Sequence, residues 1–429
     1  MKAVIMAAGR GKRLKPITNT RPKPLIPIGG LPFLEFSIRS IKKAGIKEVL
    51  LIVGYKKEMI EEYFGNGIER CGVKIEYITQ EEQFGTAHAA KYCQEFVGDD
   101  PFLLMNGDVL TDEQVFLDVV NLYNAGKCDG VITLFAVDNP EDYGIITLDE
   151  QGYAKGIIEK PPREADVGNM ANAGIYIFDS KLFEAIDQTE ESVRGEYEIT
   201  DSIEILIKNG AKIHGYDLSK FFWSDIGLPW QLLDANQFIL SKMESAINGD
   251  VEENVNIKGK VYIGNNSRIM SGTYIEGPVF IGEGTIIGPN AYLRPYACIC
   301  NNCRVGNSSE IKNSIIMSNS NIPHFNYVGD SIIGSGVNLG AGTKIANLKL
   351  TETTVKVKIE DEIVDTKRRK LGTIIGDNVK TGISANIICG VKIGNDSLIG
   401  ANTLVNEDIP PGSVFYVDFR KDFIKKERK

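Results

Sequence analysis

An isoleucine-rich repeat of six residues governs the second half of the chain. Aliphatic side chains recur at every sixth position, eleven times without a break, from Ile257 to Met317. The period resumes out of phase at Ile322 and returns after residue 375, where only Thr381 departs from it. A six-residue period is typical of a parallel β-helix, in which each repeat forms one short side of a coil. We therefore predict such a coil over residues 252–412.

Two stretches interrupt this repeat. IPHFNYVGD, residues 322–330, follows the slip in the period and holds one of only three histidines in the chain. A histidine beside aromatic and amide side chains at this point indicates a functional site, the alternative being a surface irregularity. Residues 350–371 are charged and out of step, so we expect an excursion from the coil. We expect residues 413–429 to form a basic, solvated tail.

The first half alternates apolar runs with helical patterns. Residues 2–8, 48–55, 73–80, 101–108 and 130–137 are nearly continuous in Val, Ile, Leu and Phe, which is typical of strands covered on both faces. A helix is expected over residues 32–45, because Leu34, Ile38 and Ile41 form one stripe between a proline and a glycine.

This alternation predicts an α/β fold, a Rossmann-like and mostly parallel sheet with helices on its faces, over residues 1–240. Ligands of such sheets bind beyond the carboxyl ends of the strands. A helical pattern over residues 230–247 joins the halves, and we assign a helical linker to residues 241–251.

Composition limits the partners and the compartment. A net charge of −9 and a pI near 5.2 argue against nucleic acid or an anionic membrane as a partner. No apolar run reaches the roughly 18 residues of a membrane span, and we see no signal peptide. Seven scattered cysteines suit a reducing cytoplasm. Cys298, Cys300 and Cys303 lack a fourth ligand nearby, so we interpret them as packing residues rather than a metal site.

A basic, glycine-containing loop follows the first strand. Between Arg10 and Lys23 lie six basic residues and no acidic one. Gly9 and Gly11 let backbone N–H groups approach a ligand closely, which suits a polyphosphate. The loop matches neither the Walker A nor the dinucleotide-binding pattern, and a solvated basic loop is the alternative.

Six motifs carry a family resemblance. AAGRGKRLKPITNTRPKPL after the first strand, NGD at 106–108, DYG at 142–144, EKP at 159–161, NAGIY at 172–176 and WSDIG at 223–227 resemble, in order, the sugar-1-phosphate nucleotidylyltransferases. The resemblance implies that a sugar-1-phosphate oxygen attacks the α-phosphorus of a nucleoside triphosphate and expels pyrophosphate. Such a reaction depends on positioning and charge neutralisation.

The resemblance also implies roles for single residues. Asp108 and Asp225 would hold Mg²⁺, while Arg13 and Lys23 would be catalytic cations at the triphosphate; a helix cap is the alternative for Asp108. The residues implied for the nucleotide are Ala8, Gly9, Gly11, Gln80, Gly85 and Thr86. Those implied for the sugar phosphate are Gly144, Glu159, Lys160 and Asn172, with an exposed ion pair as the alternative for Glu159 and Lys160. The Q-x-x-Q-x-G-T form of residues 80–86 resembles uridylyltransferases more than thymidylyltransferases, which favours UTP.

The second half resembles a second transferase. LRPYA at 293–297, VGNSSEIKNS at 305–314, IPHFNYVGDS at 322–331 and NLGAGTKIAN at 338–347 are similar to the acetyltransferase half of bifunctional N-acetylglucosamine-1-phosphate uridylyltransferase/glucosamine-1-phosphate acetyltransferases, in an archaeal-like form. Family members use acetyl-CoA and a left-handed coil that forms homotrimers, and both features are implied here.

Positions in the coil follow from spacing and from this resemblance. Arg294 and Lys312 lie 18 residues apart, or three repeats, so they can stack on one face and hold a phosphate. His324 matches the general base that takes a proton from the amine of the acceptor. The other matches are Tyr327, Asn338 and Asn347 for the acetyl acceptor and, loosely, Ser384 and Ala385 for acetyl-CoA.

Departures from the bacterial pattern leave glucosamine and galactosamine open as acceptors. HFNY differs from the bacterial residues, and Lys370 lies two residues before the position where a sugar-contacting lysine is expected. One alternative is a monofunctional glucose-1-phosphate thymidylyl/uridylyltransferase or mannose-1-phosphate guanylyltransferase whose coil is a scaffold. Another alternative is a non-catalytic, exchange-factor-like subunit. The presence of Arg13, Lys23, Asp108 and Asp225 argues against it.

Overall fold

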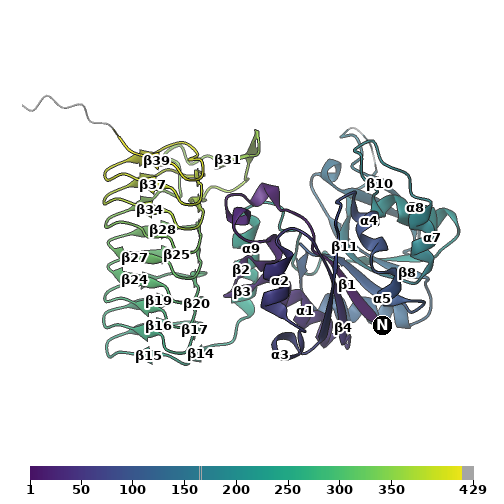
Figure 1. The fold of residues 1–429 in the computed structure, drawn as a ribbon, viewed down its shortest axis with the longest axis horizontal. Helices are drawn as coiled ribbons and strands as arrows, with labels where there is room; N and C mark the ends of the chain where they lie inside the picture. Colours follow the sequence, from purple (N-terminus) through teal and green to yellow (C-terminus); the bar gives the residue numbers. More distant parts are fainter. Residues whose placement is uncertain (164, 166, 418–429) are drawn as a thin grey trace, which may run out of the picture. The chain divides into compact units, whose positions relative to one another are not determined.

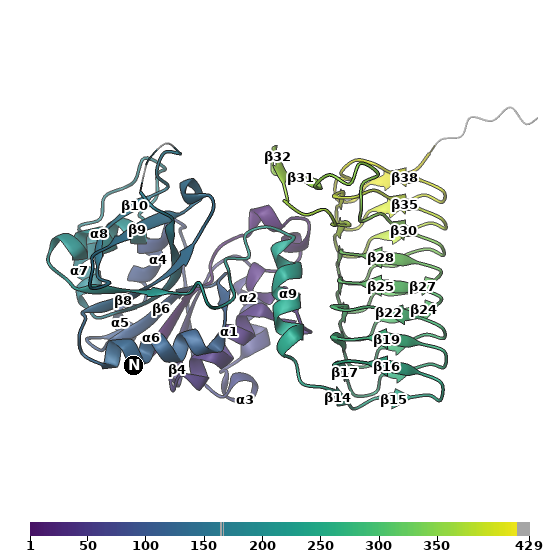
Figure 2. The same ribbon diagram turned by 180° about the vertical axis from the view of Figure 1, so that it is seen from behind.

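The computed structural model describes residues 1–163, 165 and 167–417 (Figures 1 and 2). By their contacts, these residues fall into two compact units. The first comprises residues 1–11, 21–26 and 31–227, and the second comprises residues 12–20, 27–30 and 228 onward. None of the helices among the described residues is long and apolar enough to cross a membrane.

One sheet organises the first unit. Its strands are β1 (Lys2–Met6), β4 (Glu48–Val53), β5 (Lys74–Thr79), β6 (Phe102–Asn106), β8 (Gly130–Ala136), β9 (Gly144–Leu148), β10 (Ala154–Glu159), β11 (Met170–Phe178) and β12 (Ile213–Asp217). The order is β10-β9-β11-β6-β1-β4-β5, with β8 between β11 and β12. All five predicted strands are present, and β6, β1, β4 and β5 are neighbours in parallel. The predicted mostly parallel sheet is confirmed.

Helices cover this sheet on both faces, as hydrophobic clusters on either side of it indicate. They are α1 (Phe33–Lys43), α2 (Lys57–Phe64), α3 (Ile68–Cys71), α4 (Thr86–Lys91), α5 (Gln94–Val97), α6 (Glu113–Asn124), α7 (Lys181–Asp187) and α8 (Ile199–Lys208). The helix predicted over residues 32–45 is α1, and its stripe of Leu34, Ile38 and Ile41 is fully buried.

The second unit is a parallel β-helix with three faces, so the predicted coil is confirmed (Figures 1 and 2). Face 1 consists of β14 (Ala246–Ile247), β17 (Val261–Ile263), β20 (Val279–Ile281), β23 (Cys298–Ile299), β26 (Ile315–Ile316), β29 (Ile332–Ile333), β33 (Ile374–Ile375) and β36 (Lys392–Ile393).

The other two faces follow the same pattern. Face 2 consists of β15 (Asp250–Val251), β18 (Arg268–Ile269), β21 (Ile286–Ile287), β24 (Arg304–Asn307), β27 (Asn321–His324), β34 (Lys380–Thr381), β37 (Leu398–Ile399) and β39 (Val414–Phe415). Face 3 consists of β16 (Asn256–Lys258), β19 (Tyr274–Glu276), β22 (Tyr292–Leu293), β25 (Glu310–Lys312), β28 (Tyr327–Gly329), β30 (Lys344–Ile345), β35 (Asn386–Ile387) and β38 (Leu404–Val405).

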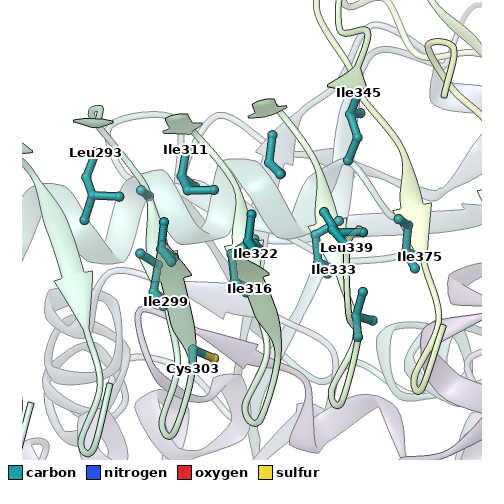
Figure 3. Close-up of a cluster of buried hydrophobic side chains, with 14 of the residues drawn as sticks. Leu293, Ile299, Cys303, Ile311, Ile316, Ile322, Ile333, Leu339, Ile345 and Ile375 are labelled. Carbon is teal, nitrogen blue, oxygen red and sulfur yellow. The ribbon is translucent and has the colours of Figure 1, made fainter. Parts of the chain in front are cut away.

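The break in the six-residue period lies elsewhere than predicted. Ile299 pairs with Ile316, not with Met317, so the first five-residue step runs from Ile311 to Ile316 (Figure 3). A second short step ends at Ile333. The stretch 322–330 keeps the six-residue step at its start, and the prediction that the period slips directly before it is wrong. Residues 316 and 317 are both apolar and both buried, so hydrophobicity could not locate the missing residue.

Both short steps fall at the corner where face 3 leads into face 1. The predicted excursion leaves the coil at the same corner, since face 1 passes directly from Ile333 to Ile375. The excursion contains the hairpin of β31 (Lys356–Ile359) and β32 (Glu362–Asp365), and its prediction is confirmed. Its ends meet where Leu371 N donates to Asn347 O at 3.0 Å.

The predicted helical linker over 241–251 is wrong. Helix α9 (Gln231–Lys242) ends at the start of this range, and Ala246–Ile247 already pairs with the next coil. From Ala246 onward the backbone groups pair with the next coil of the β-helix instead of continuing the helix. The contact division also lies at Gly227, earlier than residue 240. At the other end, β39 extends the coil past residue 412, and the predicted tail beyond residue 417 lies outside the described residues.

Cys298, Cys300 and Cys303 are buried free thiols, as expected of packing residues. Burial raises the pKa of Cys303 to about 12. Among the described residues, no group of three His, Cys, Asp or Glu side chains is arranged to hold a metal.

Candidate active sites

The candidate site of the first unit lies at the carboxyl ends of neighbouring parallel strands. Ala8 and Gly9 follow β1, Gln80 follows β5, and Asp108 follows β6. These strands lie in one parallel group, so the three segments emerge at the same edge of the sheet. The position is the one expected for ligand binding in such a sheet.

A lysine ties two acidic residues together at this edge. Lys23 Nζ lies 2.8 Å from Asp108 Oδ2 and donates to the backbone oxygen of Asp225 at 3.3 Å. The sequence brings these residues close because β13 (Trp223–Ser224) pairs with β7 (Leu110–Thr111), so Asp225 follows one strand and Asp108 precedes the other. One cation and two acidic residues thus meet at the carboxyl end of β6.

Asp108 and Asp225 fit a Mg²⁺ ion that is shared with a substrate. Mg²⁺ prefers oxygen ligands and is usually held by one or two carboxylates together with substrate phosphates. The Asp108 side chain is 37% exposed, which leaves it accessible.

Gln83 joins the basic loop to the segment at 80–86, and sequence reasoning missed it. Its side-chain Nε2 donates to Ala8 O at 2.8 Å. A Cβ on the exposed Gly9 would meet nothing within 4 Å, so a ligand can approach its backbone. Gly11 has a φ of +60°, which favours glycine. Arg13 is exposed on a short 3₁₀ turn, Lys12–Leu14. The division of the chain by contacts assigns this turn to the second unit.

The segment predicted to read the base is partly committed to packing. Gln80 is buried and its Nε2 lies 3.4 Å from His88 Nδ1. A Cβ on Gly85 would meet Tyr197 O at 2.4 Å, so this glycine permits a close approach of protein backbone. Thr86 Oγ1 accepts from Ile199 N at 2.8 Å, at the start of α8. Gly85 and Thr86 therefore hold α8 against this segment.

Two carboxylates, those of Glu159 and Glu198, share one guanidinium near the residues predicted to bind the sugar phosphate. Arg194 Nη2 lies 3.1 Å from Glu159 Oε1 and 2.6 Å from Glu198 Oε1. A Cβ on Gly144 would come within 2.7 Å of Glu159, so the glycine makes room for this carboxylate. Burial raises the pKa of Glu198 to about 7, while Arg194 opposes that rise. Neither Arg194 nor Glu198 was predicted from the sequence.

Lys160 and Asn172, the other two residues predicted to bind the sugar phosphate, make different contacts from Gly144 and Glu159. Lys160 is exposed and its backbone N donates to Tyr143 O at 2.9 Å. The Asn172 amide donates to Tyr176 Oη at 2.7 Å and accepts from Gly174 N at 3.0 Å. Asn172 thus shapes the end of β11 through two local bonds.

In the coil, Arg294 and Lys312 stack as their spacing predicted. Leu293 pairs with Ile311 and Lys312 with Gly329, so the two cations occupy one column at the end of face 3. Each is paired with a carboxylate that sequence reasoning missed: Arg294 with Glu310 at 2.8 Å and Lys312 with Asp330 at 3.3 Å. The bond to Glu310 raises the pKa of Arg294.

Tyr327 and Asn347 lie at the same corner. A Cβ on Gly329 would meet Tyr327 Oη at 2.6 Å and Asn347 Nδ2 at 2.7 Å, so this glycine leaves room for both side chains. Asn347 Nδ2 donates to Asp330 Oδ2 at 2.5 Å. Burial raises the pKa of Tyr327. We call the six residues Arg294, Glu310, Lys312, Tyr327, Asp330 and Asn347 the corner cluster.

His324 lies at the end of β27 on face 2, three residues before Tyr327. Its imidazole is exposed and, among the described residues, makes no hydrogen bond with the corner cluster. Asn338 pairs with Asn321 and Lys380 on face 2, also away from that cluster. Ser384 is exposed at the corner leading to face 3, whereas the Ala385 side chain packs inside the coil, which leaves only its backbone for acetyl-CoA.

Comparisons with known proteins agree with this division. The nucleotidyl transferase family model matches residues 2–242. The model of the GMPPB C-terminal domain matches residues 275–382, and a bacterial transferase hexapeptide model of six repeats matches residues 372–407.

Relatives match along almost the whole chain. The "Bifunctional protein GlmU" of Methanococcus maripaludis strain C5 is 46% identical, with 97% of each chain covered. The "Bifunctional sugar-1-phosphate nucleotidylyltransferase/acetyltransferase" of Sulfurisphaera tokodaii is 42% identical over 97% of this chain and all of the relative. A solved structure of a putative glucose-1-phosphate thymidylyltransferase from Bacillus anthracis is 30% identical with a TM-score of 0.52, and covers 57% of this chain and 97% of its own.

The fold and the two sites define a two-domain transferase, with a nucleotidyl transferase sheet domain and a hexapeptide-repeat β-helix. The chain belongs to the bifunctional GlmU family of sugar-1-phosphate nucleotidylyltransferase/acetyltransferases. It is an enzyme, and its hexapeptide domain fits the acetyltransferase half of that function.

Proposed function

We propose that this enzyme makes UDP-N-acetylglucosamine in two reactions. The coil, residues 252–412, acetylates glucosamine-1-phosphate with acetyl-CoA, and residues 1–240 then couple the product to UTP and release pyrophosphate. The observation that carries the proposal is the stacking of Arg294 and Lys312 at the end of face 3, because a pure scaffold needs no column of cations. Two cations one coil apart suit a phosphate group.

In the first reaction, His324 takes the proton of the acceptor amine while the nitrogen attacks the thioester carbonyl. A C–N bond forms, the C–S bond breaks, and the departing CoA thiolate takes up the proton that His324 removed from the amine, which returns the imidazole to its neutral form. An imidazole suits this role because it titrates near neutral pH. The exposed position of His324 at a corner of the coil supports access for both substrates.

Arg294 and Lys312 are assigned to the acceptor phosphate, and Tyr327, Asn338 and Asn347 to its sugar and amine. A subunit boundary is the natural place for acetyl-CoA near Ser384 and Ala385, so we propose a homotrimer built through the coil. The relatives and the hexapeptide repeats support small-molecule substrates and self-association.

In the second reaction, the phosphate oxygen of N-acetylglucosamine-1-phosphate attacks the α-phosphorus of UTP. Lys23 and Arg13 neutralise the triphosphate, and Asp108 and Asp225 hold the Mg²⁺ that supplies further positive charge. The backbone at Ala8, Gly9 and Gly11 receives the phosphates. Gln80 is assigned to the base, while Gly85 and Thr86 act on the nucleotide site by holding α8 against this segment.

Gly144, Glu159, Lys160 and Asn172 are assigned to the sugar phosphate of this second reaction. A solved UDP-glucose pyrophosphorylase complexed with UDP-glucose, 25% identical with a TM-score of 0.51, supports UTP. Free cysteines throughout the described residues and the chemistry of UTP and acetyl-CoA support a cytoplasmic enzyme.

One alternative has support of its own. The match of residues 275–382 to the GMPPB C-terminal domain favours a monofunctional sugar-1-phosphate nucleotidyltransferase with a scaffolding coil. The two readings differ in one product, since only the bifunctional enzyme releases a free thiol from acetyl-CoA.

The test is incubation of the full chain with glucosamine-1-phosphate, acetyl-CoA, UTP and Mg²⁺, with thiol and pyrophosphate followed separately. We expect both products, and pyrophosphate only after thiol. Galactosamine-1-phosphate in a parallel reaction measures the acceptor range. Absence of thiol with either amino sugar would overturn the acetyltransferase, and absence of pyrophosphate with any nucleoside triphosphate would overturn the nucleotidyltransferase.

A further inference from the structure

Helix α9 belongs by its contacts to the same unit as the coil (Figure 2). Asn236, fully buried, donates from Nδ2 to Tyr296 O of the coil at 3.0 Å. Arg368, which follows the hairpin of the excursion, donates to Asp234 Oδ1 at 2.7 Å. The helix is therefore attached by polar bonds both to the coil and to the excursion.

A third contact from α9 leads toward the corner cluster. Gln237 Nε2 donates to Asn313 Oδ1 at 2.9 Å, and Asn313 Nδ2 donates to Asp330 Oδ1 at 2.7 Å. An amide can accept through its oxygen while it donates through its nitrogen, so the two bonds run in one direction from helix to carboxylate. Asn313 and Asp330 are both buried, which leaves little water to replace either bond.

Asp330 is the point where three donors meet. Besides Asn313, its carboxylate accepts from Asn347 Nδ2 at 2.5 Å and lies 3.3 Å from Lys312 Nζ. A buried carboxylate needs such partners, and in return it fixes the donors in place. Two of the three, Lys312 and Asn347, are residues assigned above to the acetyl acceptor.

Backbone geometry restricts which residue types can occupy the corner position of Asp330. Tyr296, Asn313 and Asp330 occupy equivalent corners of successive coils with φ of +67°, +42° and +51°. Asn and Asp adopt this left-handed conformation more readily than other non-glycine residues. This conformation favours Asn and Asp, although Tyr296 adopts it too, so Asp330→Asn is the substitution that best keeps the backbone.

We propose that Asp330 is a positioning residue of the acetyl-acceptor site, and that helix α9 fixes it through Gln237 and Asn313. The inference rests on the proposed acetyltransferase function and deepens it. Asp330 does not touch the acceptor; it holds the Lys312 ammonium for the acceptor phosphate and the Asn347 amide for the sugar. The affinity for an amino-sugar phosphate then depends on a helix outside the hexapeptide repeats.

The test measures thiol release by the full chain with glucosamine-1-phosphate and acetyl-CoA. Gln237→Met keeps the length of the side chain and removes the donor, so we expect the acceptor KM to rise about fivefold. Asp330→Asn turns an N–H group toward two donors, Lys312 and Asn347, and we expect the acceptor KM to rise at least about tenfold. The KM for acetyl-CoA and kcat should change less than about twofold, because these residues act on acceptor binding.

Two further variants sharpen the result. The double variant Gln237→Met/Asp330→Asn should equal Asp330→Asn alone, because both changes act through one chain of bonds. Ser241 lies one turn further along α9, and within the described part of the chain its hydroxyl bonds only to Phe238 O. Ser241→Ala should therefore behave as wild type. Release of pyrophosphate from N-acetylglucosamine-1-phosphate should be unchanged in every variant.

The outcomes separate this inference from the proposed function. A wild-type enzyme that releases no thiol with either amino-sugar phosphate would overturn the acetyltransferase itself. A wild type that releases thiol, with an acceptor KM unchanged in both Gln237→Met and Asp330→Asn, would overturn only the positioning role. Equal losses in kcat and in both KM values, with lowered thermal stability, would show general structural damage and also overturn it.

Discussion

Lys23 and Asp108 form an ion pair of 2.8 Å at the carboxyl end of β6, and the same ammonium contacts the backbone of Asp225. One ammonium thus contacts both of the acidic residues that we assign to Mg²⁺, the side chain of Asp108 and the backbone of Asp225. The ion pair satisfies the carboxylate of Asp108, whose side chain is 37% exposed.

Asp108→Asn removes one of the two carboxylates assigned to Mg²⁺. Pyrophosphate release should fall at least about 100-fold, because charge neutralisation supplies most of the catalysis in phosphoryl transfer. Thiol release from acetyl-CoA should be unchanged. In the wild type, removing Mg²⁺ with a chelator should likewise lower pyrophosphate release and leave thiol release unchanged. Asp99→Asn, on an exposed loop residue, is the matched control. A variant that keeps normal pyrophosphate release would exclude Asp108 as a metal ligand.

Lys312→Met removes one cation of the stacked pair. Loss of a charge-assisted bond to phosphate costs about 1.5–3 kcal/mol, so the acceptor KM should rise about 10- to 100-fold. Lys258 stands in the same column of face 3, two coils before Arg294 and exposed, so Lys258→Met tests the general effect of lost charge. Equal effects of the two substitutions would contradict a phosphate site at Lys312.

Glu198 makes stability depend on pH. Its pKa in the folded chain is about 7, above an ordinary value of 4.5, because burial disfavours the charged form. The folded state therefore holds the proton more tightly between these values. The resulting stabilisation is complete below pH 4.5 and is lost as the pH rises through about 7.

Glu198→Gln should remove this dependence and leave the first unit more stable than wild type at pH 8, by about 2 kcal/mol. Denaturant unfolding between pH 5 and pH 8 gives the comparison, followed by the fluorescence of Trp223 in a Trp230→Phe background so that the signal reports on the first unit. Glu62→Gln, at an exposed position, should follow the wild type. Parallel curves for wild type and Glu198→Gln would show that Glu198 is ionised across this range.

Asn326, between Phe325 and Tyr327, is buried, and neither polar atom of its side chain has a partner in the described part of the chain. An unpaired buried amide costs about 1–3 kcal/mol. Ser309 is the equivalent residue of the preceding coil. We expect Asn326→Ser to keep or raise the unfolding temperature, while Ile322→Ala in the same coil lowers it. A lower unfolding temperature for Asn326→Ser would show that the amide is satisfied, for instance by a buried water.

The sequence predicted the coil well because its repeat is a direct consequence of the fold. Most inward positions are filled by aliphatic residues. Thr381 is an exception, and its hydroxyl is bonded to that of Thr343. The five-residue step to Ile316 could not be predicted, since Met317 is equally apolar and buried. Strand register, which a hydrophobic pattern does not contain, decides between them.

The candidate sites were predicted unevenly for a similar reason. The stacking of Arg294 and Lys312 could be predicted from the sequence, because 18 residues return the chain to the same column of the coil. Glu310 and Asp330, which pair with them, carry no motif and are found only through contacts between coils. Gly85 was assigned to a ligand although its space is taken by Tyr197, because a sequence cannot say which backbone approaches a glycine.

His324→Ala tests the central claim, that one chain carries two separate transferases. The purified variant is supplied with acetyl-CoA and glucosamine-1-phosphate, and separately with UTP, Mg²⁺ and N-acetylglucosamine-1-phosphate. We predict that thiol release falls at least about 100-fold for lack of the general base, while pyrophosphate release stays within about twofold of wild type. Thiol release at the wild-type rate, or loss of both products in a folded variant, would contradict the account.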